Sequence, residues 1–238
     1  MPQTLRQCIR TLYLRYRHYY LLAWKLCTGR LHVLSAAYSH RIYFSQFGED
    51  TFIEHYFEQK PKGFYIDVGA FHPYLYSNTC YLYQSGWDGI NIEPNPMSFK
   101  LFEKYRVDQI NLNLAISSEM GEAVFNCSEE FSGLENDDYI FYGRRRENQC
   151  TVNTAPLSSI LDQHLPPNVD LDFLNIDCEG HDLNVLKTND WDKYRPALIF
   201  VEEHEQGESK VTEYLMAQEY KKLTRLGFTL VFEDQKLK

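Results

Sequence analysis

The chain has 238 residues, 44% of them hydrophobic and 15% aromatic, which allows a sizeable core and argues against extensive disorder. Its formal net charge of −9 is unevenly spread: residues 1–48 carry seven Lys or Arg and no Asp or Glu, so the remainder has a net charge of −16. An acidic body is a poor partner for a polyanion, so we expect no nucleic-acid partner.

Three further features bear on the cellular compartment. No uncharged apolar run reaches about 18 residues, so no transmembrane helix is expected. Charges are spread through the first residues, where a signal peptide would have an uninterrupted apolar core. The six cysteines form no C-x-x-C motif and show no regular spacing. We therefore expect a cytoplasmic protein with reduced thiols.

Residues 4–27 predict a basic, aromatic, amphipathic helix. They contain no Gly or Pro, and Leu5, Ile9, Leu12 and Tyr16 recur at helical spacing with arginines between them. Such a helix can lie on an anionic membrane surface, at the inner face of the membrane. The alternative, which we favour, is a helix packed on its own domain or on a second subunit of a homo-oligomer. We place residues 1–42 in this helical extension and residues 43–238 in one domain.

From Phe47 onward, segments with helical and strand periodicity alternate. Expected helices are 48–59, 78–86, 98–106, 157–164, 181–189 and 211–227, and expected strands are 64–70, 89–94, 109–117, 122–128, 171–180, 197–205 and 228–235. Residues 128–156 are polar and predicted to be irregular. Alternation of this kind predicts an α/β fold with a mostly parallel sheet covered by helices on both faces.

Acidic residues stand at the ends of four predicted strands: Asp67, Glu93, Asp177 with Glu179, and Glu202 with Glu203. In parallel α/β sheets, ligands bind at the carboxyl ends of the strands. One acid at a strand end is often only loop solubility. Four on one edge of a sheet indicate a ligand site.

The end of the first predicted strand is compatible with a nucleoside. Gly69 lets the backbone approach another group closely, and Glu93, 26 residues after Asp67, can accept both hydroxyls of a ribose. The G-x-G-x-x-G motif is absent, and Pro73 in the turn removes a backbone N–H that a pyrophosphate needs. An NAD-linked oxidoreductase is therefore a remote alternative. S-adenosylmethionine has no diphosphate, and its cationic sulfonium and amino group suit an acidic pocket around Asp67 and Asp177.

Five stretches in this order resemble the FkbM-type S-adenosylmethionine-dependent methyltransferases: SQFGED at 45–50, GFYIDVGAFHPYLYSNT at 63–79, GWDGINIEPNP at 86–96, NLAIS at 113–117 and LDFLNIDCEGHDLNVLK at 171–187. The resemblance covers residues 43–233. It implies a class I methyltransferase fold, which is Rossmann-like, and O-methylation of sugars or polyketide-type hydroxyls in glycan or secondary-metabolite pathways.

The resemblance also implies roles for single residues. Asp67 and Gly69, with Ala70 beside them, line the methionine end of the cofactor, and Glu93 holds the ribose. Ala115 lies by the adenine, and Asp177 faces the methionine moiety or the reacting centre. Gln46 and Asp50, in the SQFGED stretch, contribute to the cofactor pocket. Two features depart from the family. The C-terminal region has room for only one clear strand, which leaves open a missing edge strand or an unusual pairing, and residues 1–42 have no counterpart.

A hydroxyl acceptor benefits from a positioned base, because it is a poor nucleophile until it loses its proton. His181 is our first choice, and Glu179, Glu203, His204 and His72 are further candidates. A second possibility is Mg²⁺ on Asp177, Glu179, Glu203 and His204, which would acidify the hydroxyl. We favour the simpler interpretation that these acids neutralise the sulfonium, so the metal is left unassigned.

The sequence thus predicts an S-adenosylmethionine-dependent O-methyltransferase that acts on a small-molecule or glycan acceptor. The irregular segment 128–155, with Arg144, Arg145 and Arg146, is expected to cover the substrate. The arginines would suit a phosphate-linked sugar, although a solvated charge run is the more common explanation. The alternative function is a methyltransferase fold that has lost catalysis and serves as a binding subunit.

Overall fold

The structure is a computed structural model that describes residues 43–127, 133–134, 149–204 and 209–236. The chain divides into two units, Met1–Ile42 and Tyr43–Lys238. The helix predicted over residues 4–27 lies outside the described residues, so its membrane and packing alternatives both stay predictions. Among the residues described, no helix is both long enough and apolar enough to cross a bilayer.

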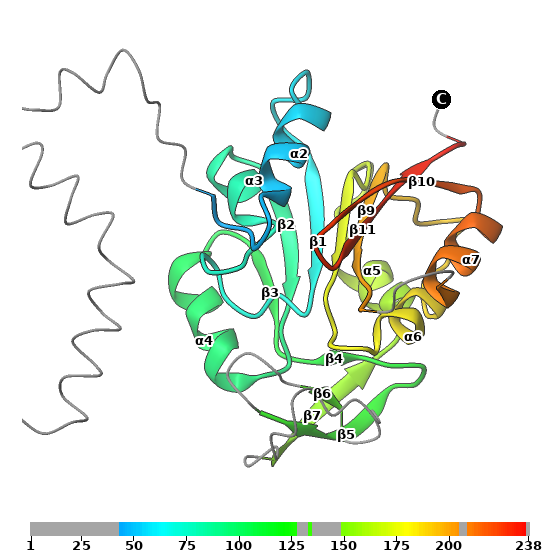
Figure 1. Cartoon of the computed structure of the whole chain (residues 1–238). Coiled ribbons are helices and arrows are strands. Elements are labelled where there is room, and N and C mark those ends of the chain that lie inside the picture. Colours follow the sequence, from blue (N-terminus) through cyan, green and yellow to red (C-terminus); the bar gives the residue numbers. More distant parts are fainter. Residues whose placement is uncertain (1–42, 128–132, 135–148, 205–208, 237–238) are drawn as a thin grey trace, which may run out of the picture. The chain divides into compact units, whose positions relative to one another are not determined.

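The second unit is built on a sheet that has seven strands in its described part, in the order β10-β11-β9-β8-β1-β2-β3 (Figure 1). The five strands β3, β2, β1, β8 and β9 pair in parallel, whereas β11 is antiparallel to both β9 and β10. Their bounds are β1 (Phe64–Val68), β2 (Asp88–Ile92), β3 (Ile110–Leu112), β8 (Phe173–Ile176), β9 (Leu198–Glu202), β10 (Tyr220–Leu226) and β11 (Thr229–Asp234).

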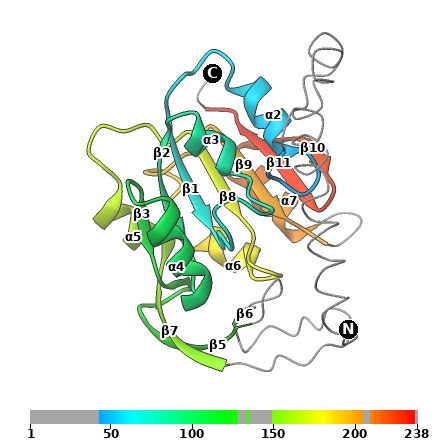
Figure 2. The ribbon, with the colours of Figure 1, turned by 90° about the vertical axis from the view of Figure 1, so that its left-hand side faces the viewer.

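Helices cover both faces of this sheet, as Figure 1 and Figure 2 show. They are α2 (Glu49–Tyr56), α3 (Cys80–Gln84), α4 (Pro96–Tyr105), α5 (Leu157–His164), α6 (Asp182–Lys187) and α7 (Lys210–Ala217). Side chains alternate along each strand, so neighbours enter different cores. Ile66 packs with Leu157 and Leu215 on one face, while Tyr65 packs with Ile53 on the other. The predicted α/β architecture is confirmed.

A second, smaller sheet has the order β4-β7-β5-β6 and lies below the main sheet in Figure 1. Its strands are β4 (Ala115–Ile116), β5 (Gly121–Asn126), β6 (Gly133–Leu134) and β7 (Gln149–Ala155). The prediction of irregular structure over residues 128–156 is wrong for β7, which pairs with β5 from Gly121↔Thr154 to Asn126↔Gln149. Hydrogen bonds to β5 make this segment a strand, although its polar sequence alone does not predict one. Arg144, Arg145 and Arg146, which also belong to that segment, lie outside the described residues.

The predicted helix over residues 211–227 is wrong in its second half. Helix α7 ends at Ala217, Glu219 adopts a positive φ of 65°, and Tyr220–Leu226 forms the edge strand β10. The exposed Lys221 and Lys222 are typical of an edge strand, which must avoid pairing with other chains. The edge strand that the sequence left open is therefore present, in the antiparallel pair with β11.

Candidate functional site

A cavity of about 290 Å³ opens at the carboxyl ends of β1, β2, β8 and β9, and residues of β4 and β5 close its other side. Ten of the residues that the sequence singled out line it: Gln46, Asp67, Gly69, Ala70, Glu93, Ala115, Asp177, Glu179, His181 and His204. Glu203 and His72, also candidates for the base, are not among its described lining residues. The fold thus brings together residues that are up to 158 positions apart. Their individual roles stay predictions.

Gly69 stands where the ends of β1 and β8 touch. Its φ is +74°, and a Cβ atom built there would lie 1.8 Å from the carbonyl oxygen of Asp177. Its backbone N–H donates to the carbonyl of Ile92 at 3.0 Å, which ties the turn to β2. The glycine was predicted for close approach to a ligand. The structure shows that the backbone of Asp177, directly after β8, is also close to this position and leaves no room for a side chain.

Asp67 is 2% exposed and is held by two donors from the protein. The Thr79 hydroxyl donates to one carboxylate oxygen and the Asn175 amide to the other, at 2.9 Å for Asn175. Burial raises the pKa of this carboxyl, and the positive charge of Arg106 works in the opposite direction. Asp67 is therefore fixed in place by a buried polar network before any ligand arrives.

Arg106 is the residue in this network that sequence reasoning missed. It follows α4 directly and is completely buried. Its guanidinium donates to the carbonyl of Pro73 at 2.7 Å, to the Thr79 hydroxyl at 2.8 Å and to the Asn91 side chain at 2.9 Å. An arginine in the last turn of a predicted helix looks solvent-exposed, so no local signal could have identified it. Its bonds hold the segment after β1 against β2.

Glu93 lies at the end of β2 and is 4% exposed. One carboxylate oxygen accepts the N–H of Phe71 at 2.6 Å and the other accepts the N–H of Asn95 at 2.7 Å. Burial raises the pKa of Glu93 to about 7, against the effect of these two backbone hydrogen bonds. A carboxylate has about four lone-pair positions, so two remain for the hydroxyls of a ribose.

The His72-Pro73 turn has a structural explanation. The Nδ1 atom of His72 accepts the backbone N–H groups of Tyr74 and Leu75, each at 3.0 Å. His72 is not among the described residues that line the cavity. We therefore remove it from the candidates for the base.

The other end of the cavity is acidic. Ile176 and Val201 are register partners, so Asp177 and Glu202 come next in the chain, at the ends of the neighbouring strands β8 and β9. Burial raises the pKa of Glu202 to about 8, assisted by the charges of Asp182 and Glu179. Burial and the neighbouring Glu202 likewise raise the pKa of Asp177.

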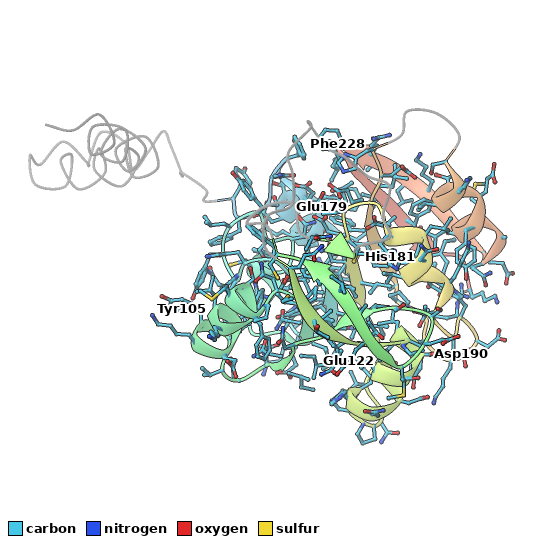
Figure 3. The ribbon with its side chains drawn as sticks, turned by 90° about the horizontal axis from the view of Figure 1, so that it is seen from below. Tyr105, Glu122, Glu179, His181, Asp190 and Phe228 are labelled. Atoms are coloured by element: carbon cyan, nitrogen blue, oxygen red, sulfur yellow. The ribbon has the colours of Figure 1, made fainter. Side chains whose placement is uncertain are left out.

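Two histidines border this acidic end. The Nε2 atom of His204 lies 3.2 Å from a carboxylate oxygen of Glu202. His181 precedes α6, and its Nδ1 lies 3.3 Å from the side-chain amide of Asn184. An amide N–H can only donate, so Nδ1 accepts and the proton of the neutral ring sits on Nε2. Figure 3, viewed from the side of the second sheet, shows where Glu179, His181 and Phe228 lie.

The SQFGED motif positions Gln46 at the cavity from outside the sheet. Asp50 accepts the N–H of Phe44 at 2.7 Å and the hydroxyl of Ser45 at 2.6 Å, and Glu49 accepts the hydroxyl of Thr229 at 3.1 Å. Both acids are buried and hold the loop in place. Asp50, which we had also considered for the cofactor pocket, does not line the cavity in its described part.

Comparisons with known proteins agree with this arrangement. The model of the methyltransferase FkbM domain matches residues 67–230. No curated protein matches the sequence. Among solved structures, a TehB-like SAM-dependent methyltransferase from Corynebacterium glutamicum ATCC 13032 Kitasato is 12% identical, with a TM-score of 0.40 over 89% of this chain and 97% of that one. That likeness is too weak to carry an argument.

The family match covers more than half of the chain and confirms the resemblance that the motifs predicted. The sheet order and the antiparallel β11 beside β9 are those of a class I methyltransferase-like α/β fold. The chain therefore belongs to the FkbM methyltransferase-domain family.

Proposed function

We propose that this protein transfers a methyl group from S-adenosylmethionine to a hydroxyl of a sugar, glycan or related metabolite. The observation that carries the proposal is one cavity that joins Glu93 at the end of β2 to the acidic ends of β8 and β9. Membership of the FkbM family supports the reaction class. When bound, S-adenosylmethionine supplies an electrophilic methyl group.

The residues of the cavity fit this cofactor part by part, from its purine to its methionine end. Ala115, Ile116 and Phe125 offer an apolar wall for a purine, and Glu93 next to them offers acceptors for ribose hydroxyls. Gly69 and Ala70 bring the backbone of the first turn to the methionine end. Five carboxyl groups and no Lys or Arg stand among the described residues of the lining, which suits a ligand with a sulfonium and an ammonium group.

The hydrogen bond at His181 bears on the choice of the base. With Asn184 at its Nδ1, the neutral ring carries its proton on Nε2 and is suited to donating a hydrogen bond to the acceptor. The group formed by Glu179, Glu202 and His204 has the more suitable chemistry for accepting the hydroxyl proton. We therefore assign proton removal to this group and acceptor positioning to His181.

The alternative function, a binding subunit without catalysis, rested on the open question of whether the edge strand is lost. That strand is present as β10. The two functions differ in one measurable respect. Purified protein, labelled S-adenosylmethionine and a panel of sugars and sugar conjugates should yield a labelled methyl ether, detected by mass spectrometry. Binding of S-adenosylhomocysteine without transfer to any acceptor would favour the subunit. Absence of both would refute the proposed function.

The cytoplasmic location, the glycan acceptor, the cover over residues 128–155 and the homo-oligomer remain predictions.

A further inference from the structure

We propose that Glu179, Glu202 and His204 together bind one divalent transition-metal ion inside the cavity. The role that we give the ion rests on the proposed function, whereas its binding does not. Each of the three residues offers one ligand atom, and these atoms all lie within 4.8 Å of one another.

The geometry is close to that of a formed site. Metal–nitrogen and metal–oxygen bonds in such sites are about 2.0–2.2 Å long, so ligand atoms at tetrahedral angles on one ion lie roughly 3.3–3.6 Å apart. The ligand atoms of the three residues, all within 4.8 Å of one another, would have to approach by at most about 1.5 Å to reach that spacing.

The ligands come from two neighbouring segments that the sheet fixes. Glu202 is the last residue of β9 and His204 follows two residues later, while Glu179 lies in the turn between β8 and α6. The parallel pairing of β8 with β9 places these segments side by side. Glu203, between the two β9 ligands, is not in the group, and its backbone N–H donates to the carbonyl of Phe228 at 2.9 Å.

The state of Glu202 is a second, independent observation. Its Oε2 atom is buried and accepts no hydrogen bond within the described part of the chain. Its neighbour at 3.2 Å is Nε2 of His204, which is the other ligand from the same segment. A buried carboxylate oxygen that no donor satisfies is costly, and a metal ion beside it would remove that cost.

A cation in addition to the cofactor also suits the acidic lining of the cavity. Its described lining holds the carboxyl groups of Asp67, Glu93, Asp177, Glu179 and Glu202, and no Lys or Arg. S-adenosylmethionine has two positive groups and one carboxylate, so its net charge is only one positive unit. Arg106 compensates Asp67 at the β1 end. At the β8–β9 end His204 lies 3.2 Å from Glu202, and a divalent ion would add positive charge beside these acids.

The ligand types indicate which ion would bind. Mg²⁺ and Ca²⁺ take oxygen ligands, whereas imidazole suits Mn²⁺-to-Zn²⁺ chemistry when it is combined with carboxylates. The Mg²⁺ considered from sequence, with Asp177 and Glu203 among its ligands, is thus replaced by a transition metal on a different set. Three protein ligands leave positions open for the hydroxyl of an acceptor.

Such an ion would acidify the acceptor hydroxyl where the proposed reaction needs it. In the balanced transfer the oxygen–methyl bond forms as the sulfur–methyl bond breaks, the sulfur keeps the bonding pair, and the hydroxyl proton is released to water. With the ion bound, the proton removal assigned above to Glu179, Glu202 and His204 would run through the ion that they hold, which favours release of the hydroxyl proton to water.

The test uses the full-length chain, stripped with a chelator and dialysed. Titration with Mn²⁺, followed by the electron paramagnetic resonance signal of the free ion, should give one site. Co²⁺ should give visible absorption bands of a bound ion with nitrogen and oxygen ligands. Glu202→Gln and His204→Gln should each weaken Mn²⁺ binding at least about tenfold, whereas Glu203→Gln should leave it within about twofold.

The controls separate this proposal from the proposed function. Each variant is first checked for cooperative unfolding and for binding of S-adenosylhomocysteine, so that a misfolded protein is not scored as a lost site. If wild-type protein binds S-adenosylhomocysteine but no Mn²⁺ or Co²⁺, or if Glu203→Gln loses the ion as completely as Glu202→Gln, the metal proposal is wrong and the methyltransferase proposal stands.

Discussion

At the scale of single residues, Gly69 and Gly86 form a matched pair. Both have a positive φ, of 74° and 83°, but a Cβ atom at Gly86 would meet nothing within 4 Å. At Gly69 it would collide with the backbone of Asp177. Alanine variants at the two positions therefore separate the free-energy cost of a positive φ from the cost of the collision with the backbone of Asp177.

We predict that Gly86→Ala lowers the free energy of unfolding by about 1 kcal/mol, the cost of a left-handed conformation for alanine. Gly69→Ala should lose about 1–3 kcal/mol more, because the collision is with backbone that cannot rotate away. It should also abolish S-adenosylhomocysteine binding. Denaturant unfolding and calorimetry measure both effects. Equal losses of stability in the two variants would contradict the contact.

Glu93 should make cofactor binding depend on pH. Burial raises its pKa from 4.5 to about 7, so the stability that this proton provides is fully present below about pH 4.5 and is lost as the pH rises to about 7. Acceptance of ribose hydroxyls favours the carboxylate. Affinity for S-adenosylhomocysteine should therefore rise by about tenfold from pH 6 to pH 8. Glu93→Gln should weaken binding and flatten this dependence, and an unchanged slope in the variant would exclude Glu93 as its origin.

At the scale of elements, the buried guanidinium of Arg106 joins the end of α4 to the segment between β1 and α3. Removing it leaves Asp67 as a buried acid without a compensating charge. We predict that Arg106→Met lowers the free energy of unfolding by about 3–5 kcal/mol. Lys104→Met, on the exposed face of the same helix, should change it by less than about 0.5 kcal/mol. If Arg106→Met lowers the free energy of unfolding no more than Lys104→Met does, the hydrogen bonds of Arg106 do not stabilise this part of the fold.

Prediction from sequence succeeded for elements with clear hydrophobic periodicity. The buried β1, β2, β8 and β9 and the acids at their ends were found because apolar runs followed by carboxylates are a local pattern. It failed for β7 and β10, whose polar, partly exposed residues become strands only through pairing with β5 and β11. Arg106 and the Glu202–His204 contact were also missed, because long-range packing decides both.

At the scale of the whole molecule, the described part of the site belongs to the second unit. Every described residue that lines the cavity lies between Gln46 and Phe228, within Tyr43–Lys238. We predict that a chain of residues 43–238 binds S-adenosylhomocysteine within about twofold of the full chain, because it keeps every described lining residue. Loss of binding in a truncated protein that still unfolds cooperatively would place part of the site in residues 1–42.

The central claim is that one cavity, walled by Ala115 and Glu93, holds the cofactor. Titration calorimetry with S-adenosylhomocysteine tests it most directly, on wild type, on Ala115→Trp and on Val124→Trp as a control. Ala115 is buried in the cavity wall, whereas Val124 is 38% exposed on β5 of the same sheet. We predict one saturable site in wild type and in Val124→Trp, and none in a folded Ala115→Trp. Absence of binding to wild type, or undiminished binding to Ala115→Trp, would contradict the account.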